Sequence, residues 1–216
     1  MAHVLFDVNG TLLDPRALTA SWDGAPSALG LSILDQTVAQ AMVDTMTGEF
    51  RPFSEYIRAA LAHRAQLAGL GDDAVEAGLR ASAALPPYPD AADALARLVV
   101  AGHTPSALTN SPAEGARSAL REAGLLEHFH AVISVEAVRA YKPDRRVYAH
   151  AVELLGTPAG EAWFVAGHWW DVAGAKRAGL RTAWIGRDEG ALLDTVPDPD
   201  IRAADLKDAA EAIAAA

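Results

Sequence analysis

The sequence predicts an α/β fold, with a parallel sheet covered by helices on both faces and a helical insertion after the first strand. Several short, nearly continuous apolar segments are typical of strands that are buried on both sides. From residue 88 onward these segments alternate with segments of helical periodicity. Residues 15–87 show helix-spaced apolar positions and no strand signal. The 216 residues, 51% of them hydrophobic, suffice for one large core with an insertion.

The first strand is predicted at residues 3–8, and it delivers Asp7 into a turn. Carboxyl ends of parallel strands are where open α/β sheets place their chemistry. Gly10 can adopt a positive φ and leaves room for a ligand, and Thr11 adds a hydroxyl beside the carboxylate. Asp7 is therefore a candidate nucleophile that could form a covalent intermediate. The same residues also make an ordinary Asx turn, and the motif alone does not decide between the two interpretations.

The insertion is predicted to be a helical bundle. Apolar residues recur at helical spacing at Leu34, Val38, Met42 and Met46, and a second series follows from Ile57. Pro52 fits a first helical turn, glycines 69 and 71 fit a helix end, and residue 72 or 73 fits the next N-cap.

The second half of the chain alternates helix and strand up to a terminal helix. Residues 111–114 match a capping box, and Asp90 is placed to cap the preceding helix. Trp163 and Trp184 fall within predicted strands and are interpreted as core. The predicted helices are 90–100, 111–124, 145–155, 171–178 and 203–216, and the predicted strands are 103–108, 131–135, 162–166 and 182–185.

Three strand ends, at residues 7, 109 and 166, should meet at one edge of this sheet. The insertion leaves the first strand at that edge and would cover Asp7. Thr109 and Asn110 precede a helix N-terminus, which favours an anion, although each also fits a local structural role. Lys142 is one of three lysines and could balance carboxylates, whereas an isolated lysine is more often a solvated loop residue.

The loop after the fourth strand carries a further group of polar residues. Asp171 could position Lys142, assist a water or ligate a metal, or simply favour the start of a helix. His168 could activate water, and a loop histidine bonded to the backbone is an equally good interpretation. Trp170 could form a wall of the pocket.

Four motifs together resemble one known family: FDVNGTLLD at residue 6, LTNSP at 108, YKPDRRVY at 141 and FVAGHWWDVAGAKRAGL at 164. Their order is similar to that of the haloacid dehalogenase superfamily of aspartate-nucleophile hydrolases, and most similar to its 2-haloacid dehalogenase branch. The resemblance implies a Rossmann-like core of residues 1–14 and 88–216 and a helical cap of residues 15–87.

The resemblance also implies a cofactor-independent reaction in which Asp7 displaces a halide from a small anionic substrate and water cleaves the resulting ester. Catalytic roles are expected for Asp7, Lys142, Asp171 and His168. Substrate-binding roles are expected for Asn9, Thr11, Gln36, Thr109, Asn110, Tyr148 and Trp170.

The sequence departs from its relatives at several positions. Phosphatases of the superfamily carry a second aspartate where this chain has Asn9, and the imine-forming branch needs a cap lysine, but residues 15–90 contain none. The halide-binding arginine of the dehalogenases falls near Asp35, beside Gln36. Their aromatic residue after the nucleophile and their Ser-x-Asn correspond to Asn9, Ala166 and His168. Arg16 or Arg51 could compensate for the missing arginine.

Two alternatives stay open. The first is a phosphatase acting on a small phosphorylated metabolite, in which Mg²⁺ binds Asp7, the Asn9 carbonyl and Asp171. The second is a non-catalytic relative that binds a small acid or a partner protein.

Charge and composition exclude several other classes. A net charge of −10 without basic runs argues against nucleic acid binding, and the chain lacks cysteine for disulfides or thiolate chemistry. No signal peptide and no apolar stretch of about 20 residues is found, so we expect a cytoplasmic protein that does not enter membranes. A homodimer is a reasonable expectation for such a chain.

Overall fold

The computed structural model describes residues 1–216 and contains one six-stranded, fully parallel sheet. The strand order is β3-β2-β1-β4-β5-β6, so β1 and β4 lie at its centre. The strands are β1 (His3–Phe6), β2 (Thr104–Thr109), β3 (Ala131–Ser134), β4 (Trp163–Ala166), β5 (Arg181–Ile185) and β6 (Ile201–Ala203). The predicted α/β class with a doubly wound parallel sheet is confirmed.

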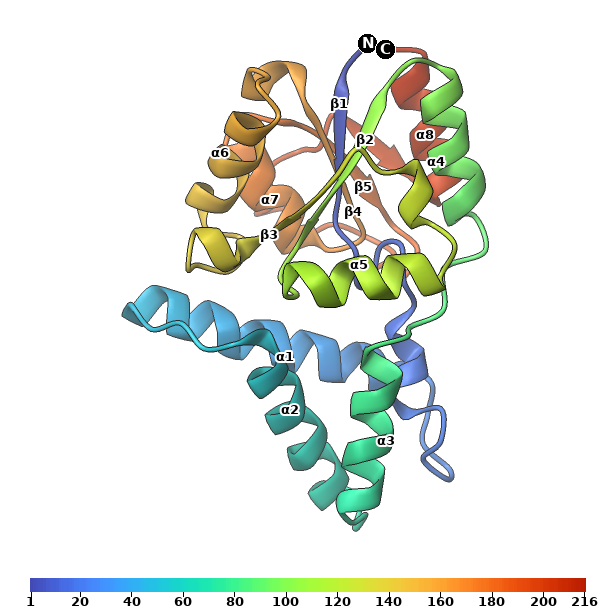
Figure 1. The fold of residues 1–216 in the computed structure, drawn as a ribbon, viewed down its shortest axis with the longest axis vertical. Coiled ribbons are helices and arrows are strands. Elements are labelled where there is room, and N and C mark those ends of the chain that lie inside the picture. The colour runs from blue at the N-terminus through green and yellow to red at the C-terminus, as the bar shows by residue number, and fades with distance from the viewer.

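Helices cover both faces of the sheet because each central strand is apolar on both sides. In β1, Val4 and Phe6 belong to one hydrophobic cluster and Leu5 to the other, as alternation along a strand requires. One face packs against α4 (Ala91–Val100) and α8 (Leu206–Ala214), with α5 (Ala113–Glu122) toward the lower edge. The other face packs against α6 (Arg145–Leu154) and α7 (Trp169–Arg177) (Figure 1).

Three helices form a separate layer beyond the carboxyl edge of the sheet (Figure 1). They are α1 (Ala28–Thr47), α2 (Phe53–Leu67) and α3 (Asp72–Ser82), and the short η1 (Pro15–Thr19) leads into them. Ile33, Ile57 and Leu61 are buried where these helices pack together. We call α1–α3 the helical insertion; its place next to the end of β1 sets which residues face Asp7.

Several local predictions need correction. Met46 does not continue the buried stripe of α1, since its side chain is 86% exposed near the helix end. The capping box at residues 111–114 does not form, because the amide of Ala113 donates to the carboxylate of Glu136 instead. Asp90 occupies an N-cap position without capping, because its carboxylate accepts from Arg187 and from the amide of Leu206.

Two boundaries differ for identifiable reasons. The terminal helix begins at Leu206 rather than at residue 203, because residues 201–203 form the edge strand β6, which the sequence analysis missed. Helix α7 begins at Trp169, so Asp171 lies within its first turn and not at its start. Trp163 and Trp184 are buried, as predicted. None of the helices combines the length and apolar character needed to cross a bilayer.

Candidate active site

The ends of β2, β1 and β4 lie side by side, and their loops surround Asp7 as the sequence predicts. Asp7 follows the last residue of β1, and its amide donates to the carbonyl of Val165 in β4. This backbone bond fixes the carboxylate at the centre of the edge. Asp7 is 95% buried and lines a small cavity.

Lys142 joins two carboxylates beneath that cavity. Its Nζ donates to Asp7 Oδ1 and to Asp171 Oδ2 at 2.7 Å each, and to the carbonyl of Leu108 at 3.1 Å. The three protons of the ammonium are thereby used. Lys142 and Asp171 are both fully buried, so the three charges stabilise one another in place of water.

The pKa values of this group follow from burial and from the shared ammonium. Burial alone would raise the pKa of Asp7, but Lys142 and His168 outweigh it and hold that pKa well below 3.8. Burial lowers the pKa of Lys142, yet the two carboxylates raise it above 10.5. For Asp171 burial prevails over Lys142, and its pKa lies above 3.8. Asp7 is thus the carboxylate that stays ionised most readily.

The second oxygen of Asp7 is held by the turn that follows β1. The hydroxyl of Thr11 donates to Asp7 Oδ2 at 2.7 Å and accepts from the amide of Gly167 at 2.9 Å. Thr11 therefore fixes Asp7 to the loop after β4 and does not itself line the cavity. Thr11 and Lys142 use two of about four lone-pair sites of the carboxylate, and the others stay available to a ligand.

His168 lies on the cavity side of Asp7. Its Nδ1 is 3.4 Å from Asp7 Oδ2, and the alignment is too poor for a hydrogen bond, so Nδ1 is buried without a bonded partner. Burial lowers the pKa of His168, but the contact with Asp7 outweighs it and raises the pKa above 6.5. The ring of Trp170 stacks against the imidazole at a centroid distance of 5.2 Å.

Close backbone approach makes room for this arrangement. Gly10 has a φ of +87°, and a Cβ there would lie 2.4 Å from the His168 ring. A Cβ at Gly167 would lie 2.7 Å from the carbonyl of Gly10. The two loops can therefore meet only with glycine at both positions.

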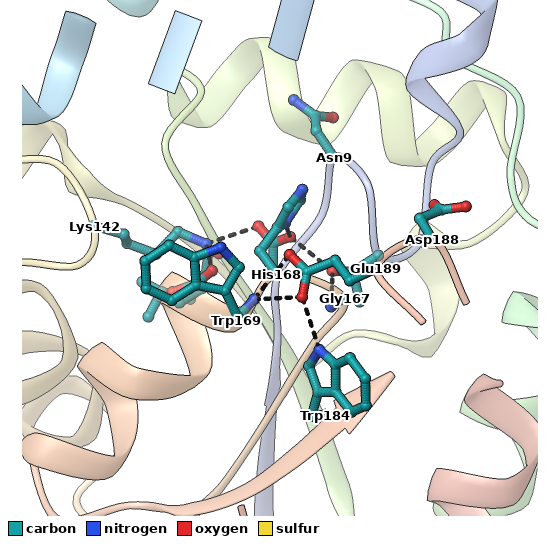
Figure 2. Close-up of polar contacts among 12 residues, drawn as sticks. Asn9, Lys142, Gly167, His168, Trp169, Trp184, Asp188 and Glu189 are labelled. Carbon is teal, nitrogen blue, oxygen red and sulfur yellow. Dashed lines mark hydrogen bonds and ion pairs between the residues drawn. The ribbon is translucent and has the colours of Figure 1, made fainter. Parts of the chain in front are cut away.

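Glu189 holds the loop that carries His168, as Figure 2 shows. Its carboxylate accepts from the amide of Trp169 at 3.0 and 3.1 Å and from Trp184 Nε1 at 3.0 Å. Sequence reasoning missed Glu189, because nothing in the local pattern connects it to a loop about 20 residues away. The carboxylate positions this backbone, and its negative charge also helps to raise the pKa of His168.

The cavity that Asp7 lines is called the nucleophile cavity below, after the predicted role of Asp7. It has a volume of about 10 Å³, and both polar and apolar residues line it. Among the predicted residues, Asn9, Thr109, Asn110 and Trp170 line it together with Asp7 and His168. The side-chain oxygen of Asn110 accepts from the backbone amide of Lys142 at 3.1 Å. This leaves the side-chain nitrogen of Asn110 as a donor for a ligand. The remaining wall comes from the helical insertion: Leu34, Val38 and Phe53.

Besides Thr11, four residues that were expected to bind substrate or to compensate for the missing arginine lie outside the cavity. Gln36 bonds His63 and Arg64 on the opposite side of α1 and lies outside the cavity. Tyr148 is fully buried, donates to the Asp171 carboxylate and lies outside the cavity. The two compensating arginines are also elsewhere: Arg16 bonds Asp14, Tyr88 and Asp188, and Arg51 bonds Asp44.

Of the residues that sequence reasoning missed, Leu34 and Val38 carried a signal. Both belong to the helix-spaced apolar series of α1, which predicts a helix but does not show which of its residues face a cavity. Phe53 carried none, because an aromatic residue in the first turn of α2 is equally typical of packing.

A parallel sheet with this strand order, an aspartate at the end of β1 and a lysine that bridges it to a second aspartate define a class of aspartate-dependent hydrolases. Comparison with protein families agrees, because the family described as haloacid dehalogenase-like hydrolase matches residues 1–179. The chain belongs to this family.

Similar relatives indicate the branch of the family. (S)-2-haloacid dehalogenase 1 of Pseudomonas sp. (strain CBS-3) is 34% identical over 189 residues, covering 85% of this chain and 83% of that protein. The (S)-2-haloacid dehalogenase of Xanthobacter autotrophicus is 33% identical over 190 residues, covering 85% and 74%. A solved structure of L-2-haloacid dehalogenase from Xanthobacter autotrophicus, with chloropropionic acid covalently bound, matches with a TM-score of 0.89 at 26% identity, covering 99% and 98%.

Proposed function

We propose that this chain is a cofactor-independent 2-haloacid dehalogenase that converts a small (S)-2-haloalkanoic acid into a 2-hydroxy acid and a halide ion. One observation carries the proposal: the ionised carboxylate of Asp7 faces a small cavity while Lys142 holds it from below. The relatives named as (S)-2-haloacid dehalogenases, one with its substrate acid covalently bound, support this choice.

In the first step, a carboxylate oxygen of Asp7 attacks the α-carbon and the carbon–halogen bond breaks. The halide leaves with the bonding electron pair on the side of the helical insertion, where the walls are apolar. Thr109 and the amide nitrogen of Asn110 hold the substrate carboxylate, which fixes the α-carbon against Asp7. An ester between Asp7 and the substrate results.

In the second step, water attacks the carbonyl carbon of that ester. Forming the ester removes the negative charge of Asp7, which is what raises the pKa of His168 against the effect of burial. The pKa of His168 therefore falls, its proton is lost, and the neutral imidazole accepts a proton from the attacking water. Lys142 stabilises the oxyanion, and as the intermediate collapses His168 returns its proton to the departing alkoxide oxygen, which releases the hydroxy acid. The Asp7 carboxyl group then loses the remaining proton of the water to His168, which restores the carboxylate and the protonated imidazole.

His168 suits this role better than Asp171 does. His168 lines the cavity, whereas both oxygens of Asp171 already accept hydrogen bonds, from Lys142 and from Tyr148. Asp171 is a positioning residue in this proposal: it orients the ammonium that binds Asp7.

The geometry disfavours the magnesium-dependent phosphatase. An ammonium already lies between the two carboxylates that would bind the cation, and it donates to both. No group of three or more histidine, cysteine, aspartate or glutamate residues converges on a point that could hold a metal ion. The third candidate, a purely binding relative, does not explain why a buried lysine keeps a cavity-facing carboxylate charged.

The proposal includes the organisation of the chain. Residues 15–87 form a cap that closes over the core of residues 1–14 and 88–216 and excludes water during the first step. The substrate is a small organic anion, and no role for nucleic acid or membranes is proposed. A cytoplasmic location and a homodimer complete the proposal.

Halide release from (S)-2-chloropropionate or (S)-2-bromopropionate tests this function. We expect release without added metal, unchanged by EDTA, and lowered by about 10⁴-fold or more in Asp7→Asn. A single turnover in ¹⁸O-labelled water would place the label in the Asp7 carboxylate, because water attacks the carbonyl carbon of the ester. Failure to release chloride or bromide, with phosphate release from aryl phosphates in Mg²⁺, would overturn the proposal in favour of the phosphatase.

A further inference from the structure

A second, larger cavity adjoins the nucleophile cavity. This cleft, of about 540 Å³, lies between α5 and the helices α2 and α3, and Asn9 and Phe53 line both spaces. The cavity over Asp7, at about 10 Å³, has room for roughly one water molecule. A larger group on the reacting carbon therefore needs an adjoining space. The cleft provides such a space beyond Asn9, whose short side chain lies where the cleft meets the nucleophile cavity.

The walls of the cleft suit an alkyl or aryl group. Ile57, Ala83 and Ala116 supply apolar surface, while the hydroxyls of Ser54 and Ser118 are interspersed among them. Contact of a hydrocarbon chain with such apolar surface is favourable by about 25 cal/mol per Å² of apolar area removed from water. The serines can accommodate a hydroxyl or a bound water without requiring one.

The nucleophile cavity has another large neighbour on its opposite side, and charge distinguishes the two. That neighbour, of about 530 Å³, shares Val38 and Trp170 with the nucleophile cavity and carries the carboxylates of Asp35 and Glu189. It contains no cationic residue, so it repels an anionic acid. The cleft beside Asn9 instead contains one cationic residue, Arg80, and one anionic residue, Glu122, so its formal net charge is zero.

We propose that the cleft between α5 and the helical insertion is a subsite for the α-substituent of the substrate. The preferred substrates are then 2-halo acids whose substituent is an alkyl chain of about four carbons or an aryl ring. This inference rests on the proposed function, because Asp7 must bind the α-carbon for the substituent to point past Asn9.

Gly115 offers a way to fill the cleft without disturbing the fold. It lines the cleft from α5, and a Cβ there would meet no atom within 4 Å. Leucine also has a higher helix propensity than glycine, so Gly115→Leu should fold. Gly160 is the matched control, since a Cβ there is equally unobstructed and Gly160 lines neither the cleft nor the nucleophile cavity.

The experiment compares kcat/KM for 2-bromohexanoate and 2-bromopropionate, which share one leaving group. In the wild type and in Gly160→Leu we expect the longer acid to be at least as good a substrate as the shorter one. In Gly115→Leu we expect the ratio of the two values to fall about tenfold or more, with 2-bromopropionate nearly unaffected.

Other outcomes overturn the inference in distinguishable ways. An equal fall for both acids in Gly115→Leu would make the cleft an access route and not a subsite. An unchanged ratio in Gly115→Leu, or a wild type that accepts 2-bromopropionate but rejects 2-bromohexanoate, would overturn the subsite alone. Absence of bromide release from both acids in the wild type would overturn the proposed function, and the subsite with it.

Discussion

Lys142 Nζ lies 2.7 Å from Asp7 Oδ1, although 135 residues separate the two in the chain. The same ammonium binds Asp171 Oδ2 at an equal distance. One cation and two buried carboxylates leave a net charge of −1, and a protonated His168 would bring the group to neutrality. The charge balance of the site therefore depends on Lys142 and on the protonation of His168.

Removing the ammonium should destabilise the fold as well as abolish activity. Lys142→Met leaves two buried carboxylates facing each other, and we expect a loss of about 3–5 kcal/mol in the free energy of unfolding at neutral pH. Lys176→Met is the control, because Lys176 forms a part-exposed pair with Asp200 and should cost about 0–1 kcal/mol. Urea denaturation measures both, and equal small losses would show that the buried pair contributes little.

Stability should depend on pH through His168. Its pKa in the folded chain lies above 6.5, since contact with Asp7 outweighs burial. A group whose pKa is raised by folding contributes its full stabilisation below its pKa in the unfolded chain, here near 6.5. That contribution is lost as the pH rises through the pKa of the folded chain. The unfolding free energy of wild type minus that of His168→Asn should therefore be largest below about pH 6.5 and decrease above it. Urea denaturation between pH 5 and 9 measures this difference in unfolding free energy, and a difference that stays constant with pH would contradict the prediction.

Gly10 should be required for its size as well as for its backbone conformation. In Gly10→Ala the new Cβ meets the His168 ring, so the imidazole must move, and we expect activity to fall by about 10²-fold. Gly24→Ala shares the positive φ, at +70° against +87°, but meets no atom within 4 Å. The control should lose about 1 kcal/mol of stability and keep its activity. Similar activity in both variants would contradict the close approach.

Tyr148 should affect the reaction through Asp171. Tyr148→Phe removes the hydroxyl that donates to the Asp171 carboxylate, which should cost about 1.5–3 kcal/mol of stability and lower kcat with little change in KM. The control is Tyr141→Phe, because the Tyr141 hydroxyl donates to the carbonyl of Arg51, outside the site. It should lose about 0.5–1.5 kcal/mol and keep kcat. A raised KM in Tyr148→Phe with kcat unchanged would return Tyr148 to the substrate-binding group.

Local patterns of the sequence were enough to predict the fold class and the position of the chemistry. Apolar strands, helical periodicity and the turn after β1 placed Asp7, Thr109 and Ala166 at one edge, because parallel strands must end on the same side of their sheet. The group of Asp7, Lys142 and Asp171 was likewise predictable as a cluster from its motifs. The short edge strand β6 was not, since three residues carry too little periodicity.

The positions on α1 show where sequence reasoning stopped. Successive helical residues are rotated by about 100°, so counting along the chain without structural anchors cannot tell which of them faces Asp7. Leu34 and Val38 line the cavity, whereas Gln36, only two residues from each, bonds His63 and Arg64 on the far side. The same limit applies to Arg16 and Arg51, whose partners lie in other segments.

The sequence by itself determined the α/β architecture, the family and the carboxylate that we propose as the nucleophile, because each rests on local periodicity or on short sequence motifs. Only the tertiary structure decided which side chains line the cavity, that Tyr148 supports Asp171 and that Glu189 holds the His168 loop. Those contacts join segments far apart in the chain, and they depend on how helices rotate and pack against the sheet, which no local pattern encodes.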